Sequence, residues 1–164
     1  VLKTRGREDV QIVFVGEGKM KQHLVERAKS EGLNNCIFLG HMPKKELNEV
    51  LKRADIGMMV LANVPAFYYG TSPNKFFDYI ASGLPVVNNY PGWLADMINE
   101  NKCGIAIEPE KPELFADALE ILAANPEMRK EFGVNGRALA EREFARDLLG
   151  GQFVDFIEKT YQAR

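Results

Sequence analysis

This 164-residue chain lacks several features that would assign it to particular protein classes. No apolar run approaches the roughly 20 residues that a membrane-spanning helix needs, and no signal peptide opens the sequence. The 21 Lys and Arg nearly balance the 23 Asp and Glu, so no overall charge attracts nucleic acid or a membrane. Cys36 and Cys103 have no ligand-like neighbours, so we expect two buried thiols in a reducing compartment rather than a disulfide or metal pair.

What remains is the pattern of a single globular domain large enough to bury a good core. Short apolar runs rich in β-branched residues alternate with amphipathic helical patterns along the chain. None of these runs alternates strictly with polar residues, which is typical of parallel strands covered on both faces. The predicted fold is therefore α/β, a doubly wound Rossmann-like parallel sheet with helices on both faces.

The expected elements follow from these patterns and from the Gly and Pro residues that bound them. Strands are predicted at 10–15, 36–39, 55–61, 84–87 and 103–107. Helices are predicted at 19–30, from Pro43, from 72 to 83, from Pro91 and at 112–124. The tail reads as further helices at 126–132, 136–144 and 145 to about 161. The inner face of the 19–30 helix is expected to carry Met20, Leu24, Val25 and Ala28.

The most informative segment reads GTSPNKFFDYIASGLPVV and spans 70–87. Ser72 is predicted to cap a helix whose first residue is Pro73, and Gly83 suits its carboxyl end. The start of such a helix presents free backbone N–H groups, and Lys75 adds a positive charge to the first turn. A phosphate group is the expected ligand.

The same segment resembles the donor-binding signature of the retaining GT-B-fold glycosyltransferases of family 4. The matching branch reads Ser-Pro-x-Lys-x-Phe-Glu-Tyr-x-Ala-x-Gly-x-Pro-Val. The resemblance implies that Asp78, at the second acidic position of a Glu-x7-Glu motif, holds the ribose hydroxyls of the donor. Gly70 stands at the first acidic position, so half of that motif is absent. Val13–Gly18 and Phe38–Gly40 extend the resemblance, which covers nearly the whole chain.

Ligands of open α/β sheets bind beyond the carboxyl ends of the strands, and three loops qualify here. The Gly16–Gly18 loop has the pattern of a tight strand-to-helix turn, and the resemblance favours its contact with the donor. Because the loop lacks the third glycine of a dinucleotide-binding motif, NAD binding is disfavoured. The resemblance implies that the 39–43 loop lines the nucleotide base, where His41 is either a base contact or simply exposed. The 68–78 segment is the expected diphosphate and ribose site. An ion pair between Lys75 and Asp78 is its structural alternative.

The predicted site follows from these three loops. The expected donor-binding residues are Gly16, Glu17, Gly18, Gly40, His41, Met42, Gly70, Thr71, Ser72, Pro73, Asn74, Lys75 and Asp78. Lys75 is also expected to stabilise the departing diphosphate, and no metal or other cofactor is expected. The roles of Tyr68, Tyr69 and Trp93 are left open between packing and sugar contact.

The resemblance implies the C-terminal, donor-binding half of a glycosyltransferase of glycan biosynthesis. Such an enzyme transfers a hexosyl group from an NDP-sugar, foremost a UDP-sugar, to an acceptor with retention. An N-terminal acceptor-binding domain is the expected partner, in a cytoplasmic enzyme or one peripheral to the inner membrane face. The isolated domain 1–164 should bind nucleotide weakly and catalyse nothing. The alternatives are half of a GT-B sugar-nucleotide 2-epimerase and a stand-alone nucleotide-binding or interaction module.

The first residues look like the tail of an interrupted helix, so the domain is expected to be truncated at its N-terminus. The family's strand order places one more central strand upstream of Val1. Without that strand, the strands at 10–15 and 55–61 lose their shared neighbour. Either the sheet closes up differently, or a second copy supplies the missing edge by self-association, or the missing segment lies outside this sequence.

Overall fold

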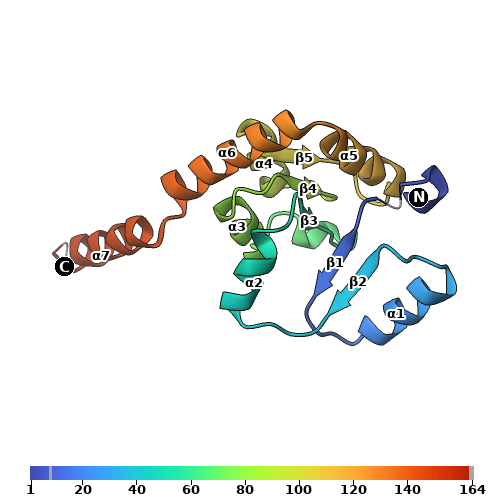
Figure 1. Ribbon diagram of the computed structural model, residues 1–164. Helices are drawn as coiled ribbons and strands as arrows, with labels where there is room; N and C mark the ends of the chain where they lie inside the picture. Colours follow the sequence, from blue (N-terminus) through green and yellow to red (C-terminus); the bar gives the residue numbers. More distant parts are fainter. Residues whose placement is uncertain (8, 163–164) are drawn as a thin grey trace.

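The computed structural model describes residues 1–7 and 9–162, and it has the predicted α/β architecture (Figure 1). The strands are β1 (Ile12–Val15), β2 (Cys36–Leu39), β3 (Gly57–Met59), β4 (Val86–Asn88) and β5 (Gly104–Ala106). The helices are α1 (Lys21–Ser30), α2 (Lys44–Leu51), α3 (Asn74–Ala81), α4 (Trp93–Glu100), α5 (Pro112–Ala124), α6 (Pro126–Glu143) and α7 (Arg146–Gln162). Two single 3-10 turns are η1 (Lys3–Arg5) and η2 (Pro65–Phe67).

The strands form two separate parallel sheets. β1 pairs with β2 from Ile12↔Cys36 to Val15↔Leu39, and the second sheet has the order β3-β4-β5. In the described part of the chain, no backbone hydrogen bond joins β1 to β3. The two sheets are therefore not closed into one, so the expected alternative of a sheet that closes up differently is wrong.

The core surrounds the three-stranded sheet on both faces. On one face, Val86 of β4 packs with Ile80 of α3 and Leu94 of α4. On the other face, the next residue, Val87, packs with α5 residues such as Leu119. Successive residues of a strand point to opposite faces, so the two clusters lie on opposite sides of the sheet, as a doubly wound fold requires.

β1 is not buried as the sequence pattern suggested. Val13, Phe14 and Val15 are 43%, 41% and 36% exposed, whereas Val86 and Val87 of β4 are completely buried. The reason is that β1 has a neighbouring strand on one side only, so the rest of the sheet and its helices do not cover it.

α1 shows the same effect on its expected inner face. It packs beside a two-stranded sheet, so that face is largely uncovered. Only Ala28 is buried there and Val25 is half-buried, while Met20 and Leu24 are exposed. Met20 also lies just before the helix, which begins at Lys21 and not at Lys19.

The tail differs from the prediction because 126–132 and 136–144 form one continuous helix, α6. Gly133 and Gly136, which interrupt the helical pattern, are buried against α3 and its carboxyl end. A Cβ at Gly133 would lie 2.2 Å from the carbonyl oxygen of Gly83, so these glycines allow close packing and do not end the helix. α7 then projects from the body with Phe153 and Phe156 exposed (Figure 1).

Cys36 and Cys103 are both free thiols, which confirms that no disulfide joins them. Cys103 is buried as predicted, and burial raises the pKa of its thiol to about 11. Cys36 is only half-buried, because its strand β2 belongs to the less covered sheet. Across the described residues, no helix combines the length and the apolarity that crossing a membrane takes.

Candidate functional site

Each of the three predicted loops follows the carboxyl end of a strand. Gly16 follows β1, Gly40 follows β2, and the segment from Gly70 leads into α3 after β3. Because the strands are parallel, all three loops leave from carboxyl ends. Between the two sheets, the ion pair of Lys44 and Asp78 brings the start of α2, which follows the second loop, next to α3, which follows the third.

The first two loops are joined directly. The backbone N–H of Gly16 donates to the carbonyl oxygen of Gly40 at 3.2 Å. Gly16 has φ 131°, a conformation that favours glycine, so its place in the turn has a backbone reason. The Glu17 carboxylate accepts a hydrogen bond from Lys21 at 2.7 Å, which lowers the Glu17 pKa, with a smaller contribution from the backbone of His41. The His41 side chain is exposed.

The start of α3 differs by one residue from the prediction. Pro73 is the N-cap, with φ −76° and ψ 123°, and the helix begins at Asn74. Ser72 is exposed and makes no capping hydrogen bond, so its predicted role as cap is wrong. The extended Pro73 takes the cap position itself, which leaves Ser72 one residue too early to reach the first turn.

The consequence is an open helix terminus. Within the described chain, the backbone N–H groups of Asn74 and Lys75 have no hydrogen-bond acceptor. These N–H groups carry the positive end of the helix dipole toward the carboxyl edge of the sheet. Water or an anionic ligand must satisfy them.

Lys75 lies in the first turn of α3, and its ammonium group forms no ion pair with the described residues. Its side chain is half-buried, and no carboxylate of residues 1–7 or 9–162 lies within 4.0 Å of its ammonium group. Burial lowers the Lys75 pKa from its ordinary value, because desolvation disfavours the charged form. The alternative ion pair between Lys75 and Asp78 is wrong. A positive charge that is partly desolvated and uncompensated is suited to bind an anion.

Asp78 instead pairs with Lys44. The Lys44 ammonium lies 2.8 Å from Oδ1 and 3.0 Å from Oδ2 of Asp78. Lys44 is the first residue of α2, three residues after His41, so the pair links the predicted base loop to α3. Lys44 was not among the predicted site residues. The only signal is its place directly after Pro43, and no local spacing marks a partner 34 residues away.

The loop between β3 and α3 is held against α4. The Trp93 indole N–H donates to the carbonyl oxygen of Thr71 at 3.0 Å. Gly92 has φ 105°, and a Cβ there would lie 2.2 Å from the carbonyl oxygen of Tyr68. Trp93 and Tyr68 therefore fix the loop that carries Gly70 and Thr71, whereas Tyr69 is 75% exposed.

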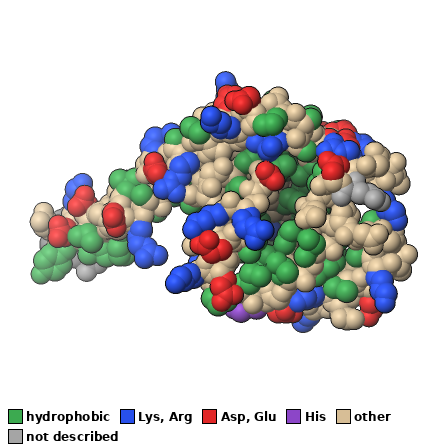
Figure 2. Space-filling model, viewed as in Figure 1, with side chains coloured by type: hydrophobic (Ala, Val, Ile, Leu, Met, Phe, Trp, Pro, Cys, Tyr) green, Lys and Arg blue, Asp and Glu red, His purple; other side chains and the backbone are tan. Residues whose placement is uncertain are grey.

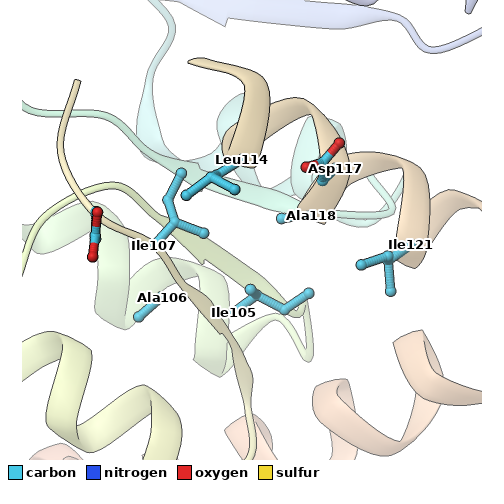
Figure 3. A pocket seen from close by; sticks show the side chains of 8 residues that line it. Ile105, Ala106, Ile107, Leu114, Asp117, Ala118 and Ile121 are labelled. Carbon is cyan, nitrogen blue, oxygen red and sulfur yellow. The ribbon is translucent and has the colours of Figure 1, made fainter. Parts of the chain in front are cut away.

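A cavity of about 370 Å³ lies elsewhere, between β5 and α5 (Figure 3). Its lining includes Ile105 and Ile107 of the β5 segment and Leu114 and Ile121 of α5. The Asp117 carboxylate, which also lines it, forms an ion pair with Arg5 at 2.6 Å. This apolar cavity lacks the donors that a phosphate or a ribose needs. In the chain as described, no group of three or more His, Cys, Asp or Glu side chains is placed to hold a metal ion.

Comparison with known proteins agrees with the arrangement at the strand ends. Residues 1–139 match the model of the family described as "Glycosyl transferases group 1". The chain belongs to this family. Its α/β fold with parallel sheets is shared with HepE of Anabaena, solved in complex with UDP, which superposes with a TM-score of 0.76 at 16% identity. That match covers 92% of this chain and 41% of HepE.

Two curated relatives are bacterial glycosyltransferases. The chain is 24% identical over 158 residues to the GDP-mannose-dependent monoacylated alpha-(1-6)-phosphatidylinositol monomannoside mannosyltransferase of Corynebacterium glutamicum. It is 29% identical over 152 residues to the D-inositol 3-phosphate glycosyltransferase of Corynebacterium diphtheriae. These matches cover 93% and 89% of the chain but only 40% and 32% of the relatives. The chain thus spans less than half the length of either relative.

Proposed function

We propose that this glycosyl transferases group 1 domain binds the nucleotide-sugar donor of a retaining glycosyltransferase, and that a UDP-sugar supplies the hexosyl group. The observation that carries the proposal is the open terminus of α3. Its free N–H groups and the half-buried, uncompensated Lys75 meet at the carboxyl edge of the strands. A diphosphate supplies the acceptors and the negative charge that this terminus lacks.

The neighbouring residues have complementary roles in the proposal. Asp78 lies one helical turn beyond Asn74 and accepts hydrogen bonds from the two ribose hydroxyls. Binding of the ribose then requires the Lys44 ammonium to release one or both Asp78 oxygens, because it pairs with both in the structure. The joined loops at Gly16–Gly18 and Gly40–Met42 contact the rest of the nucleotide through their backbone groups.

The chemistry assigned to the chain is stabilisation of the leaving group. As the bond from the anomeric carbon to the diphosphate breaks, negative charge grows on the departing oxygen. The α3 N–H groups and the Lys75 ammonium offset that charge without being protonated or deprotonated. This role requires neither a general base nor a metal ion from the described residues.

The remainder of the active site lies in other parts of the proposed enzyme. Both curated relatives are more than twice as long as this chain, and we place an acceptor-binding domain ahead of Val1. The 164-residue chain alone is therefore expected to bind nucleotide weakly and to transfer no sugar. Retention is to be tested on the whole enzyme, by NMR of the anomeric configuration of its product.

Titration of the 164-residue chain tests the donor site. UDP should shift the NMR signals of Gly16, Lys75 and Asp78, and calorimetry should give weaker binding for GDP and for uridine. GDP is the informative competitor, because the C. glutamicum relative is named for GDP-mannose and HepE was solved with UDP. Tighter binding of GDP would indicate a GDP-sugar as the donor in place of a UDP-sugar. NMR shifts confined to other regions would refute the proposed location of the site.

A variant separates the ribose role from the phosphate role. Asp78→Ala should weaken UDP binding by about 10- to 150-fold, the loss of roughly one hydrogen bond to a charged group, and leave pyrophosphate binding nearly unchanged. Asp96→Ala, at an exposed carboxylate of α4, is the matched control and should change neither. Equal losses for UDP and pyrophosphate would refute the ribose role of Asp78.

A further inference from the structure

Lys44 and Asp78 join two helices that lie far apart in the sequence. The Lys44 ammonium is 2.8 Å from Oδ1 and 3.0 Å from Oδ2 of Asp78, so it bridges both oxygens of the carboxylate. Figure 2 shows positive and negative side chains gathered on the viewed face where α2 and α3 lie. The side chain of Lys44 is 66% exposed, whereas that of Asp78 is 25% exposed. The cation is therefore free to move into solvent, while the carboxylate is held at the surface of α3.

Asp78 depends on Lys44 for the balance of its charge. No second cation of residues 1–7 or 9–162 lies within 4.0 Å of the Asp78 carboxylate. Without Lys44, an uncompensated negative charge would stand on α3, about 6 Å along the helix axis from Asn74. That charge would repel a diphosphate at the open terminus. The nearly neutral Lys44–Asp78 pair therefore leaves the attraction of the terminus for an anion intact.

A ribose competes with Lys44 for the same two oxygens. An ionised carboxylate only accepts hydrogen bonds, and one ammonium group already contacts both oxygens of Asp78. Two adjacent hydroxyls that bind both oxygens must take the place of that ammonium. A nucleoside breaks the ion pair and brings no charge to compensate the released cation. A nucleoside diphosphate brings negative charge, which attracts the released ammonium on its flexible four-carbon stem.

We propose that Lys44 makes the donor site selective for a nucleoside diphosphate over a nucleoside. Lys44 acts through Asp78 and is a positioning residue. It keeps the carboxylate neutralised while the diphosphate approaches, and it opposes any ligand that offers a ribose without phosphate. The inference rests on the proposed function, because it requires that the ribose binds Asp78.

A purely structural role for the pair gives a different pattern of effects. If the pair only fastened α2 to α3, loss of Lys44 would weaken the binding of every ligand that contacts these helices. The competition instead predicts changes of opposite sign for ligands with and without phosphate. Because Lys44 is mostly exposed, its ion pair contributes little to stability, and the signs of the binding changes are the more sensitive readout.

Lys44→Met removes the ammonium group and keeps much of the stem. In NMR titrations at low ionic strength, this variant should bind uridine about 2- to 5-fold more tightly, the strength typical of a partly exposed ion pair. It should bind pyrophosphate about 2- to 5-fold more weakly, because Asp78 then repels this anion. Both effects act on UDP and oppose each other, so the preference for UDP over uridine should fall by about 2- to 5-fold.

Two further variants control the comparison. Lys45→Met changes the next residue of α2, which is also exposed, and should leave the three affinities unaltered. Lys44→Arg keeps the positive charge and should restore the affinities of the unsubstituted chain.

Salt gives an independent readout, because uridine carries no charge. The Debye length falls from about 30 Å at 0.01 M salt to about 3 Å at 1 M, so salt weakens an exposed ion pair. Uridine should therefore bind the unsubstituted chain more tightly as salt rises, and this gain should be absent in Lys44→Met. The difference between the two proteins is the measured quantity, since a general effect of salt acts on both.

The results separate this inference from the proposed function. If UDP shifts the signals of Lys75 and Asp78 but Lys44→Met binds uridine no more tightly, the inference is overturned and the donor site stands. Weaker binding of both uridine and pyrophosphate would assign the pair a structural role and would also overturn the inference. If neither UDP nor pyrophosphate binds at α3, the proposed function and the inference fail together.

Discussion

Replacing Lys75 by methionine should have opposite effects on nucleotide binding and on stability. Methionine keeps most of the apolar stem and removes the charge that faces the open terminus of α3. Loss of one charged hydrogen bond costs about 1.5 to 3 kcal/mol, so UDP should bind about 10- to 150-fold more weakly. Binding of uridine, which has no phosphate, should be unaffected.

The stability of the ligand-free domain should not fall in the same variant. Lys75 is half-buried and has no carboxylate partner among the described residues, so its charge costs free energy in the folded state. The folded-state Lys75 pKa lies below its unfolded value of about 10.5. At pH values between the two, the unfolded chain holds more protons than the folded chain, so stability rises with pH there. The native protein should gain stability in that range through Lys75, and the methionine variant should lack this gain.

Calorimetry with UDP and uridine, together with urea unfolding at pH 7 and near pH 10, checks both effects. Lys130→Met on α6 is the control, since Lys130 is exposed and lies away from the strand ends. UDP affinity within twofold of the unsubstituted protein would refute the role of Lys75 in binding the diphosphate. A loss of stability at pH 7 would show that the ammonium has a stabilising partner in the folded protein.

Three further outcomes test the packing. Gly104→Ala should lower the free energy of unfolding by about 1 to 3 kcal/mol in urea, because its Cβ would lie 2.0 Å from a β4 carbonyl oxygen; Gly150→Ala, in open space, should not lower it. Tyr90→Phe should leave that free energy unchanged or higher, since the buried hydroxyl has no partner in the described structure; a loss above about 1 kcal/mol would reveal one. Iodoacetamide should alkylate Cys103, whose pKa is about 11, more slowly than Cys36, as followed by mass spectrometry; equal rates would contradict the burial of Cys103.

The order of strands and helices could be predicted because each element carries its own pattern. The strand at 36–39 and the helix at 112–124 match their predicted bounds, since apolar runs or proline mark both. The open terminus of α3 was also foreseeable, although its cap was assigned to Ser72. Pro73 can begin a helix or precede one, and only its ψ of 123° distinguishes the two.

Other features depend on contacts between distant parts of the chain. The exposure of β1 arises because β1 has a neighbouring strand on one side only, and the residues of β1 do not show this. The unbroken α6 depends on Gly133 meeting Gly83 across the interface with α3. The Lys44–Asp78 pair joins two helices that are separated by a strand and a long loop. In each of these cases the sequence pattern around a residue does not indicate which distant residue it contacts.

The two parts of the candidate site lie on sheets that differ in burial. α3, with Lys75 and Asp78, packs on the buried three-stranded sheet, whereas Gly16 and Gly40 follow β1 and β2, which are less covered. Pyrophosphate needs only the first part, and UDP needs both. Binding of UDP therefore includes the cost of ordering the β1–β2 part, whereas binding of pyrophosphate does not.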